Sequence, residues 1–164
     1  MKQILRWCGF ILFCFHLNGN SDLELKKWED VRFISHLTGD LVLDVFRPDD
    51  SKPRAAVLCL HGGFWAKGSK KFMHPLAEDL VEKGYVAVCS NYRLTDVASA
   101  PAQLHDVFSA IRFLRKNASD YGIDPGRIGV TGSSAGGYLA VMAAVFDSGD
   151  KITRPNAAVG MGAQ

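Results

Sequence analysis

The chain has 164 residues, of which 48% are hydrophobic and 22% are charged, and this composition is typical of a globular protein with about one domain. The formal net charge is only +2. Together these values exclude a disordered or low-complexity chain and the strongly basic balance of many nucleic-acid-binding domains.

Residues 1–20 have the layout of a secretory signal peptide. Lys2 and Arg6 precede an apolar run over 7–15, and polar residues follow it. This arrangement predicts a secreted or periplasmic protein cleaved near residues 19–21. The apolar run is shorter than the roughly 20 residues that a stable membrane anchor needs. An ordinary N-terminal helix or a misassigned start codon remains the alternative.

The remaining segment, 21–164, is predicted to be the N-terminal part of a single domain. Residues 1–20 carry two of the 19 basic residues and none of the 17 acidic ones, so 17 of each remain, and this balance gives no electrostatic reason to expect a nucleic-acid partner. Cys59 and Cys89 lie in apolar runs and are expected to be buried and unpaired. No cofactor or metal motif is found, so we expect neither, and the oligomeric state stays open.

Several apolar or β-branched runs are typical of strands. The first alternates between two faces, whereas the run at 55–60 is apolar throughout, as expected for a strand covered on both faces of a sheet. The predicted strands span residues 39–48, 55–60, 85–92, 128–132 and 157–162.

Helical patterns separate these strands. Apolar residues recur with helical spacing over 73–81, and Gly84 follows as a predicted C-terminal cap. Pro101 opens a second pattern with an apolar stripe over 104–114, and a helix of small residues follows Ser134. Strands that alternate with helices predict an α/β fold with right-handed βαβ units and a mostly parallel sheet. One or two antiparallel strands are expected to precede it.

The sequence "GSSAG" matches the nucleophile pattern G-x-S-x-G through Gly132, Ser134 and Gly136. The pattern needs a strand that ends at the first glycine and a helix that starts at the serine, and both are predicted here. The glycines are needed because side chains would clash at such a tight turn, and the helix N-terminus places amides beside a developing oxyanion. Alternatively, Ser134 is a plain N-cap and Ser133 a turn residue.

The sequence "HGGFW" at 61–65 directly follows a predicted buried strand. Paired glycines at this position leave backbone amides open to a ligand, as in an oxyanion loop. A glycine turn with an aromatic side chain packed on it is the alternative. The two motifs occur together, one after each of two strands, and this joint occurrence favours a hydrolase.

The segments "LDVFRP", "LCLHGGFW", "GYVAVCSNYRL" and "IDPGRIGVTGSSAGGYLA" occur in this order. In this respect the chain resembles the α/β-hydrolase superfamily from about residue 28 to its end. It is most similar to the esterase/lipase branch, which includes relatives of hormone-sensitive lipase and small exported esterases that act on acetylated or feruloylated polysaccharides. The resemblance implies a doubly wound, mostly parallel sheet and hydrolysis of small-molecule or polysaccharide-linked carboxylic esters.

Residue by residue, the resemblance implies that Ser134 is the nucleophile. It implies an oxyanion hole built from the backbone amides of Gly62, Gly63 and Ala135, with His61 supporting the loop. Phe64 stands where the lipase-like pattern has a third glycine. In this respect the chain is similar to arylformamidases, which carry an aromatic residue after HGG. A substrate cleaved at a C–N bond is therefore also compatible with the sequence.

The family order places an acid and then a histidine after the serine. All five histidines, at 16, 36, 61, 74 and 105, precede Ser134, and Asp147 and Asp150 are the only acids that follow it. We expect both of these carboxylates to be surface or turn residues.

These observations predict an N-terminal fragment of a longer serine esterase, with a fold incomplete on its C-terminal side. The fragment alone is expected to be inactive or nearly so, and its last strand, at 157–162, should be an uncovered apolar edge. Two other functions are compatible with the sequence: an amide or peptide hydrolase, and a non-catalytic binding protein that keeps the fold.

Overall fold

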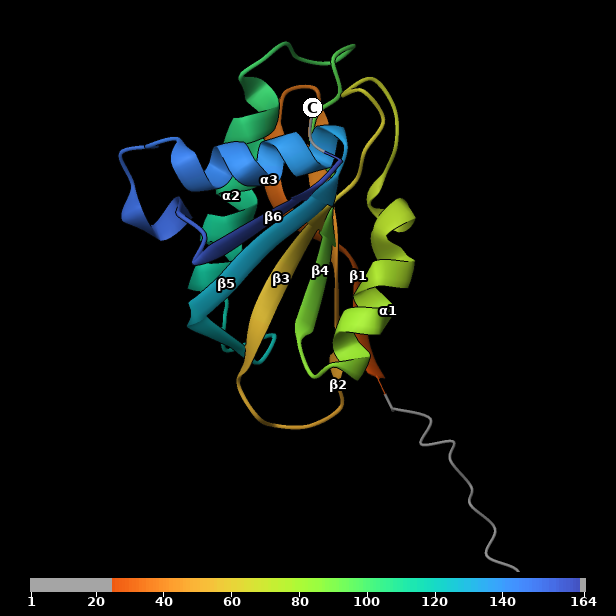
Figure 1. The fold of residues 1–164 in the computed structure, drawn as a ribbon, viewed down its shortest axis with the longest axis vertical. Helices are drawn as coiled ribbons and strands as arrows, with labels where there is room; N and C mark the ends of the chain where they lie inside the picture. The colour runs from red at the N-terminus through yellow and green to blue at the C-terminus, as the bar shows by residue number, and fades with distance from the viewer. Residues whose placement is uncertain (1–24, 163–164) are drawn as a thin grey trace, which may run out of the picture.

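The computed structural model describes residues 25–162, so the predicted signal peptide lies outside the described residues. The described chain folds into a six-stranded sheet flanked by helices (Figure 1). The strands are β1 (Leu25–His36), β2 (Gly39–Pro48), β3 (Arg54–Leu60), β4 (Val86–Ser90), β5 (Ile123–Ser133) and β6 (Ala157–Met161). The helices are α1 (His74–Glu82), α2 (Ala102–Lys116) and α3 (Ala135–Val145), with short 3₁₀ helices η1 (Lys70–Met73) and η2 (Lys151–Thr153).

The strand order is β1-β2-β4-β3-β5-β6. The first two strands form an antiparallel pair, and β2 also pairs antiparallel with β4. From β4 onward, through β3 and β5 to β6, neighbouring strands are parallel. The predicted mostly parallel α/β sheet with antiparallel strands at its start is therefore confirmed.

The helices cover both faces of the sheet, as Figure 1 shows with α1 on one side and α2 and α3 on the other. Alternation along the strands gives each face its own core. Leu58 of β3 belongs to the cluster packed with α2 and α3, whereas its neighbour Cys59 belongs to the smaller cluster packed with α1. Cys59 and Cys89 are both buried and free, as predicted.

Strand β1 has no counterpart at a defined position in the sequence prediction. Its pairing with β2 is interrupted by register shifts after Trp28 and after Arg32, and Asp30 has a φ of 53°. Most of its side chains are exposed or half-buried. Such bulges break the period-two pattern by which a strand is recognised, so the sequence signal is weak.

Strand β5 is longer than predicted. Ile123 pairs with Arg54, and regular pairing resumes only where Ile128 meets Ala56. The polar segment 124–127 is therefore an irregularity within the strand. Its later part matches the predicted run at 128–132.

Strand β6 forms one edge of the sheet. Val159 is 59% exposed and Met161 41% exposed, which agrees with the expected uncovered apolar edge. Among residues 25–162, no helix combines the length and hydropathy needed to cross a bilayer.

Candidate active site

Ser134 lies at the turn between β5 and α3, with φ of 50° and ψ of −117°. A positive φ is unusual for a residue with a side chain and marks a strained turn. A Cβ on Gly132 would lie 2.4 Å from the carbonyl carbon of Gly136, and a Cβ on Gly136 would lie 2.2 Å from the carbonyl oxygen of Leu60. Both positions therefore require glycine, which is the physical reason for the G-x-S-x-G spacing.

The hydroxyl of Ser134 is not used to cap α3. The backbone of Ser134 donates to the Met161 carbonyl at 2.8 Å and accepts from the Tyr138 amide at 2.9 Å, but its side chain makes no capping hydrogen bond. The alternative of a plain N-cap is thus not supported. Ser133 lies within β5, where it pairs with Met161, and is not a turn residue. Both serines are exposed.

The glycine loop after β3 lies against this turn. A Cβ on Gly62 would be 3.3 Å from the Cβ of Ser134 and 2.8 Å from the carbonyl oxygen of Ser133. The structure thus brings together two motifs that lie about seventy residues apart in the sequence. Within residues 25–162, the amides of Gly62, Gly63 and Ala135 donate to no protein acceptor. Ala135 is also the first residue of α3, where the helix carries a partial positive charge.

The loop itself is a tight turn. Gly63 has a φ of 123° and accepts hydrogen bonds from Ala66 and Lys67, each at 3.1 Å. Phe64 and Trp65 also have positive φ, at 56° and 59°. The turn of the alternative interpretation is present, but Phe64 is 76% exposed and the Trp65 ring meets Tyr138 of α3. This turn is compatible with a ligand role, because it leaves the Gly62 and Gly63 amides without an acceptor among the described residues.

His61 is buried at the base of this loop, with 1% of its surface exposed. Its ring stacks on Tyr92, with centroids 4.3 Å apart, and its Nδ1 lies 2.8 Å from the Gly62 carbonyl oxygen. The Tyr92 hydroxyl donates to the His61 carbonyl at 2.8 Å. Burial lowers the pKa of His61, so the neutral ring is favoured and its Nδ1–H donates to Gly62.

The other described histidines are engaged elsewhere or exposed. Nε2 of His74 lies 2.8 Å from Asp44, and Nε2 of His36 lies 3.2 Å from Asp106. No hydrogen bond joins a histidine to Ser134 anywhere in the described part of the chain.

The two carboxylates that follow Ser134 lie in the turn after α3, as expected. Asp147 is exposed and accepts from the Gly149 amide at 2.9 Å. Asp150 accepts from the Ile152 amide at the start of η2 and pairs with Arg112 at 2.9 Å.

A buried ionic cluster anchors the far end of the glycine loop, and sequence reasoning missed it. Asp44 of β2 is fully buried and accepts from Lys70 at 2.6 Å, from His74 at 2.8 Å and from the Asp30 amide at 2.8 Å. Burial would raise the pKa of Asp44, but these hydrogen bonds outweigh it and lower the pKa. The Lys70 amide donates to Asn91 at 2.7 Å. The available signal in the sequence was the charged Asp44 between its apolar neighbours in β2.

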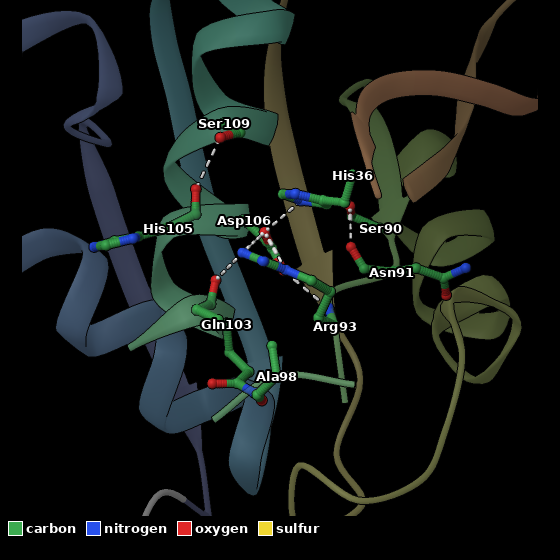
Figure 2. A network of polar contacts seen from close by, with 10 residues as sticks. His36, Ser90, Asn91, Arg93, Ala98, Gln103, His105, Asp106 and Ser109 are labelled. Carbon is green, nitrogen blue, oxygen red and sulfur yellow. Dashed lines mark hydrogen bonds and ion pairs between the residues drawn. The ribbon is translucent and has the colours of Figure 1, made fainter. Parts of the chain in front are cut away.

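A second buried ion pair holds the segment after β4 (Figure 2). Asp106 of α2 is 1% exposed and accepts from the Arg93 amide at 2.9 Å and from Arg93 Nη2 at 2.7 Å. His36 completes the group from β1. The Thr95 amide then donates to the Trp65 carbonyl at 2.9 Å, which joins this segment to the glycine loop.

A cavity of about 480 Å³ opens beside the two motifs. Its lining residues come from the glycine loop, η1 and the end of β5. They are Gly62, Gly63, Lys67, Gly68, Phe72, Met73 and Ser133. Of the two exposed serines, Ser133 lines this cavity and Ser134 does not.

Comparison with known proteins finds esterases among the relatives of this chain. The family model BD-FAE matches residues 43–159. The chain is 41% identical over 108 residues to esterase LipQ of Mycobacterium tuberculosis, covering 63% of this chain and 26% of that protein. It is also 41% identical over 102 residues to neutral cholesterol ester hydrolase 1 of Rattus norvegicus, covering 57% of this chain and 24% of that protein.

Among solved structures, native esterase Est2 of Thermogutta terrifontis superposes with a TM-score of 0.69 and 28% identity, covering 84% of this chain and 52% of that one. The chain spans about a quarter of the length of the curated relatives it matches. These matches confirm the resemblance drawn from the sequence motifs. The chain belongs to the BD-FAE family, in the esterase/lipase branch of the α/β-hydrolases.

Proposed function

We propose that the protein is a serine-dependent carboxylic-ester hydrolase with Ser134 as its nucleophile. The observation that carries this proposal is the position of Ser134 at the β5–α3 turn, beside Gly62 of the glycine loop. Its φ is positive, and its side chain makes no capping hydrogen bond to α3. A nucleophile and a set of unpaired amides, held together by two different strand ends, are the parts that acyl transfer requires. The esterase names of the relatives support the same reaction class.

In the proposed reaction, Ser134 Oγ attacks the ester carbonyl carbon as its proton is removed, and the carbonyl electron pair moves to the oxygen. The amides of Gly62, Gly63 and Ala135 stabilise the resulting oxyanion. The C–O bond to the alcohol then breaks, the alcohol leaves with a proton, and the acyl group stays on Ser134. Water attacks this acyl-enzyme, which releases the carboxylic acid and restores the serine.

His61 has a supporting role in this proposal. Its buried ring is held by Tyr92 and donates to the Gly62 carbonyl, which belongs to the same peptide plane as the Gly63 amide and so fixes the direction of that amide. Loss of a single oxyanion donor costs on the order of 100- to 1,000-fold in rate in a well-studied serine hydrolase. A small displacement of this loop would therefore weaken catalysis without affecting Ser134 itself.

We propose that the general base and its acid partner are supplied from outside the described residues. Every histidine of the sequence precedes Ser134, and those described are bonded away from it or exposed. The order of the triad in this fold places both groups after the nucleophile. On this proposal, the 164-residue chain alone turns over esters slowly or not at all. We also propose that residues 1–20 act as a signal peptide that directs export of the protein.

The substrate is proposed to be a small-molecule or polysaccharide-linked ester. An arylacetamide deacetylase of Bos taurus is 36% identical to the chain over 99 residues, and a solved relative is described as a bifunctional GH43-CE protein of Bacteroides eggerthii. The first of these names makes an amide substrate the second candidate. A matched pair of substrates, one ester and one anilide, separates the two activities.

The test uses the protein expressed from its natural reading frame and follows the release of p-nitrophenol from p-nitrophenyl acetate. We expect Ser134→Ala to lower kcat on the order of 1,000-fold or more, whereas Ser133→Ala, at the exposed neighbour, should retain most of the activity. Equal losses in the two variants, or full activity in Ser134→Ala, would contradict the proposal. Faster turnover of the matched anilide than of the ester would favour the second candidate.

A further inference from the structure

The cavity of about 480 Å³ beside the glycine loop has a single charged side chain in its lining. That side chain is Lys67, and no carboxylate contributes to the wall. The remaining lining residues are three glycines, Ser133, Met73 and Phe72, whose side chain is 70% exposed. A ligand in this cavity therefore meets a cation, an aromatic ring and the backbone of the glycine loop.

The cavity reaches the proposed oxyanion site. Gly62 and Gly63, two of the three residues whose amides are proposed to bind the oxyanion, belong to its lining. Ser134 lies just beyond this lining, since a Cβ on Gly62 would be 3.3 Å from the Cβ of Ser134. An ester whose carbonyl oxygen binds the two glycine amides therefore lies at the edge of the cavity.

The side chain of Lys67 starts at this same edge. A Cβ on Gly63 would be 3.3 Å from Lys67 Cγ, and the Lys67 amide donates to the Gly63 carbonyl at 3.1 Å. The backbone of Lys67 is thus held by the loop turn, whereas the rest of its flexible stem is free to place the ammonium over the loop or farther into the cavity.

Lys67 differs in this respect from Lys70, which lies close to it in the sequence. The Lys70 ammonium is buried and pairs with Asp44 at 2.6 Å and with Asp30 at 2.9 Å. Lys67 is exposed and forms no ion pair within the part of the chain that the structure describes. A negatively charged ligand can therefore approach Lys67 without displacing a described carboxylate.

We propose that Lys67 is a specificity-determining residue that favours esters with a carboxylate on the substituent that occupies this cavity. This inference rests on the proposed function and makes its substrate class more specific. The Lys67 ammonium pairs with the carboxylate, and Phe72 offers an apolar surface to the ring or short chain that carries it. A carboxylate on the alcohol part and one on the acyl part present the same chemistry to Lys67.

The test compares two matched pairs of esters in the protein expressed from its natural reading frame. 4-Acetoxybenzoate and 4-acetoxybenzamide differ in the charge of the alcohol part, whereas monomethyl succinate and methyl succinamate differ in the charge of the acyl part. An ion pair at an exposed lysine is worth only a few-fold, so Lys67→Gln should lower the ratio of kcat/KM, anionic over neutral ester, about three- to fivefold in at least one pair. The pair that responds more strongly identifies the part of the ester that occupies the cavity.

Two further variants at the same position keep the test independent of one substitution. Lys67→Arg should retain the ratio, and Lys67→Glu should lower it further than Lys67→Gln does. High salt should reduce the preference of the unmodified protein for the anionic ester, a response that a merely structural role of Lys67 would not produce. Unchanged melting temperatures verify that the variants fold.

Lys71→Gln is the matched control, because Lys71 is exposed in η1, carries the same charge and does not line the cavity. We expect it to leave both ratios close to those of the unmodified protein. Unchanged ratios in Lys67→Gln for both pairs of esters, or equal changes in Lys67→Gln and Lys71→Gln, would overturn the inference.

Binding to the Ser134→Ala form separates this inference from the proposed function. Saturation-transfer NMR with the same esters, in the presence and absence of the Lys67→Gln change, needs no turnover. Stronger binding of an anionic ester that depends on Lys67 supports the inference even if the unmodified protein hydrolyses none of the esters, an outcome that contradicts only the proposed function. Hydrolysis of the esters without any dependence on Lys67 would contradict only this inference.

Discussion

The two turns that meet at Ser134 are built in different ways. The serine turn is fixed by close approach of its own backbone, since Gly132 and Gly136 lie against each other and against the end of β3. The glycine loop is instead fixed by side chains that are distant in the sequence. The Tyr92 hydroxyl donates to the His61 carbonyl, and Asp44 accepts from the Lys70 ammonium. A local steric requirement is therefore visible in a short motif, whereas support from distant residues is not.

The largest effect is expected at the serine turn. Gly136→Ala would place a Cβ 2.2 Å from the Leu60 carbonyl oxygen, and because both partners are backbone, neither can move away easily. We expect a loss of about 3 kcal/mol or more in the free energy of unfolding, measured by urea denaturation. Gly129→Ala is the control, since its Cβ would make only ordinary contact at 3.6 Å. Similar losses in the two variants would show that the turn is not sterically fixed.

The loop anchor should give a comparable or smaller loss. Asp44→Asn leaves the Lys70 ammonium, which is 3% exposed, with the exposed Asp30 carboxylate at 2.9 Å as its remaining charged partner. Removal of one partner from a buried ion pair typically costs about 3 kcal/mol or more. Hydrogen exchange of residues 61–69 should accelerate more than exchange in α2. Asp40→Asn, at an exposed pair with Arg32, should change little, and an equal response would contradict the anchoring role.

The same anchor predicts a pH dependence. The pKa of Asp44 is lowered from its ordinary value of 3.8, so its ionised form stabilises the folded state above that pH, and this contribution is lost as the pH falls through the lowered pKa. The difference in unfolding free energy between the unmodified protein and Asp44→Asn should therefore shrink below about pH 4. A difference that stays constant down to pH 2 would exclude the ionised Asp44 as the source.

The smallest effect is expected at Tyr92, whose pKa burial raises to about 12. Tyr92→Phe keeps the ring stacked on His61 but removes the hydroxyl that donates to the His61 carbonyl. A loss of about 1 kcal/mol is expected, again from urea denaturation. Tyr121→Phe is the comparison variant, because the Tyr121 hydroxyl makes no hydrogen bond within residues 25–162. Identical stabilities for the two variants would show that the Tyr92 hydroxyl does not stabilise the loop.

Sequence reasoning succeeded where the signal is local. The alternation over 39–48, the buried runs and the cap at Gly84 correspond to observed elements, because each reflects spacing within one segment. It failed for β1, where bulges break the alternation. It also failed for the pairs of Asp44 with Lys70 and Asp106 with Arg93, since 26 and 13 residues separate the partners and only the fold brings them together.

The most direct test of the central claim is covalent labelling. The protein from its natural reading frame is treated with paraoxon, an organophosphate that reacts with activated serines, and the tryptic peptide 128–151 is sequenced by mass spectrometry. We expect a diethylphosphoryl group on Ser134, and no label on this peptide in the Ser134→Ala form. A label on Ser133, or an unlabelled peptide from a protein that still hydrolyses esters, would contradict it.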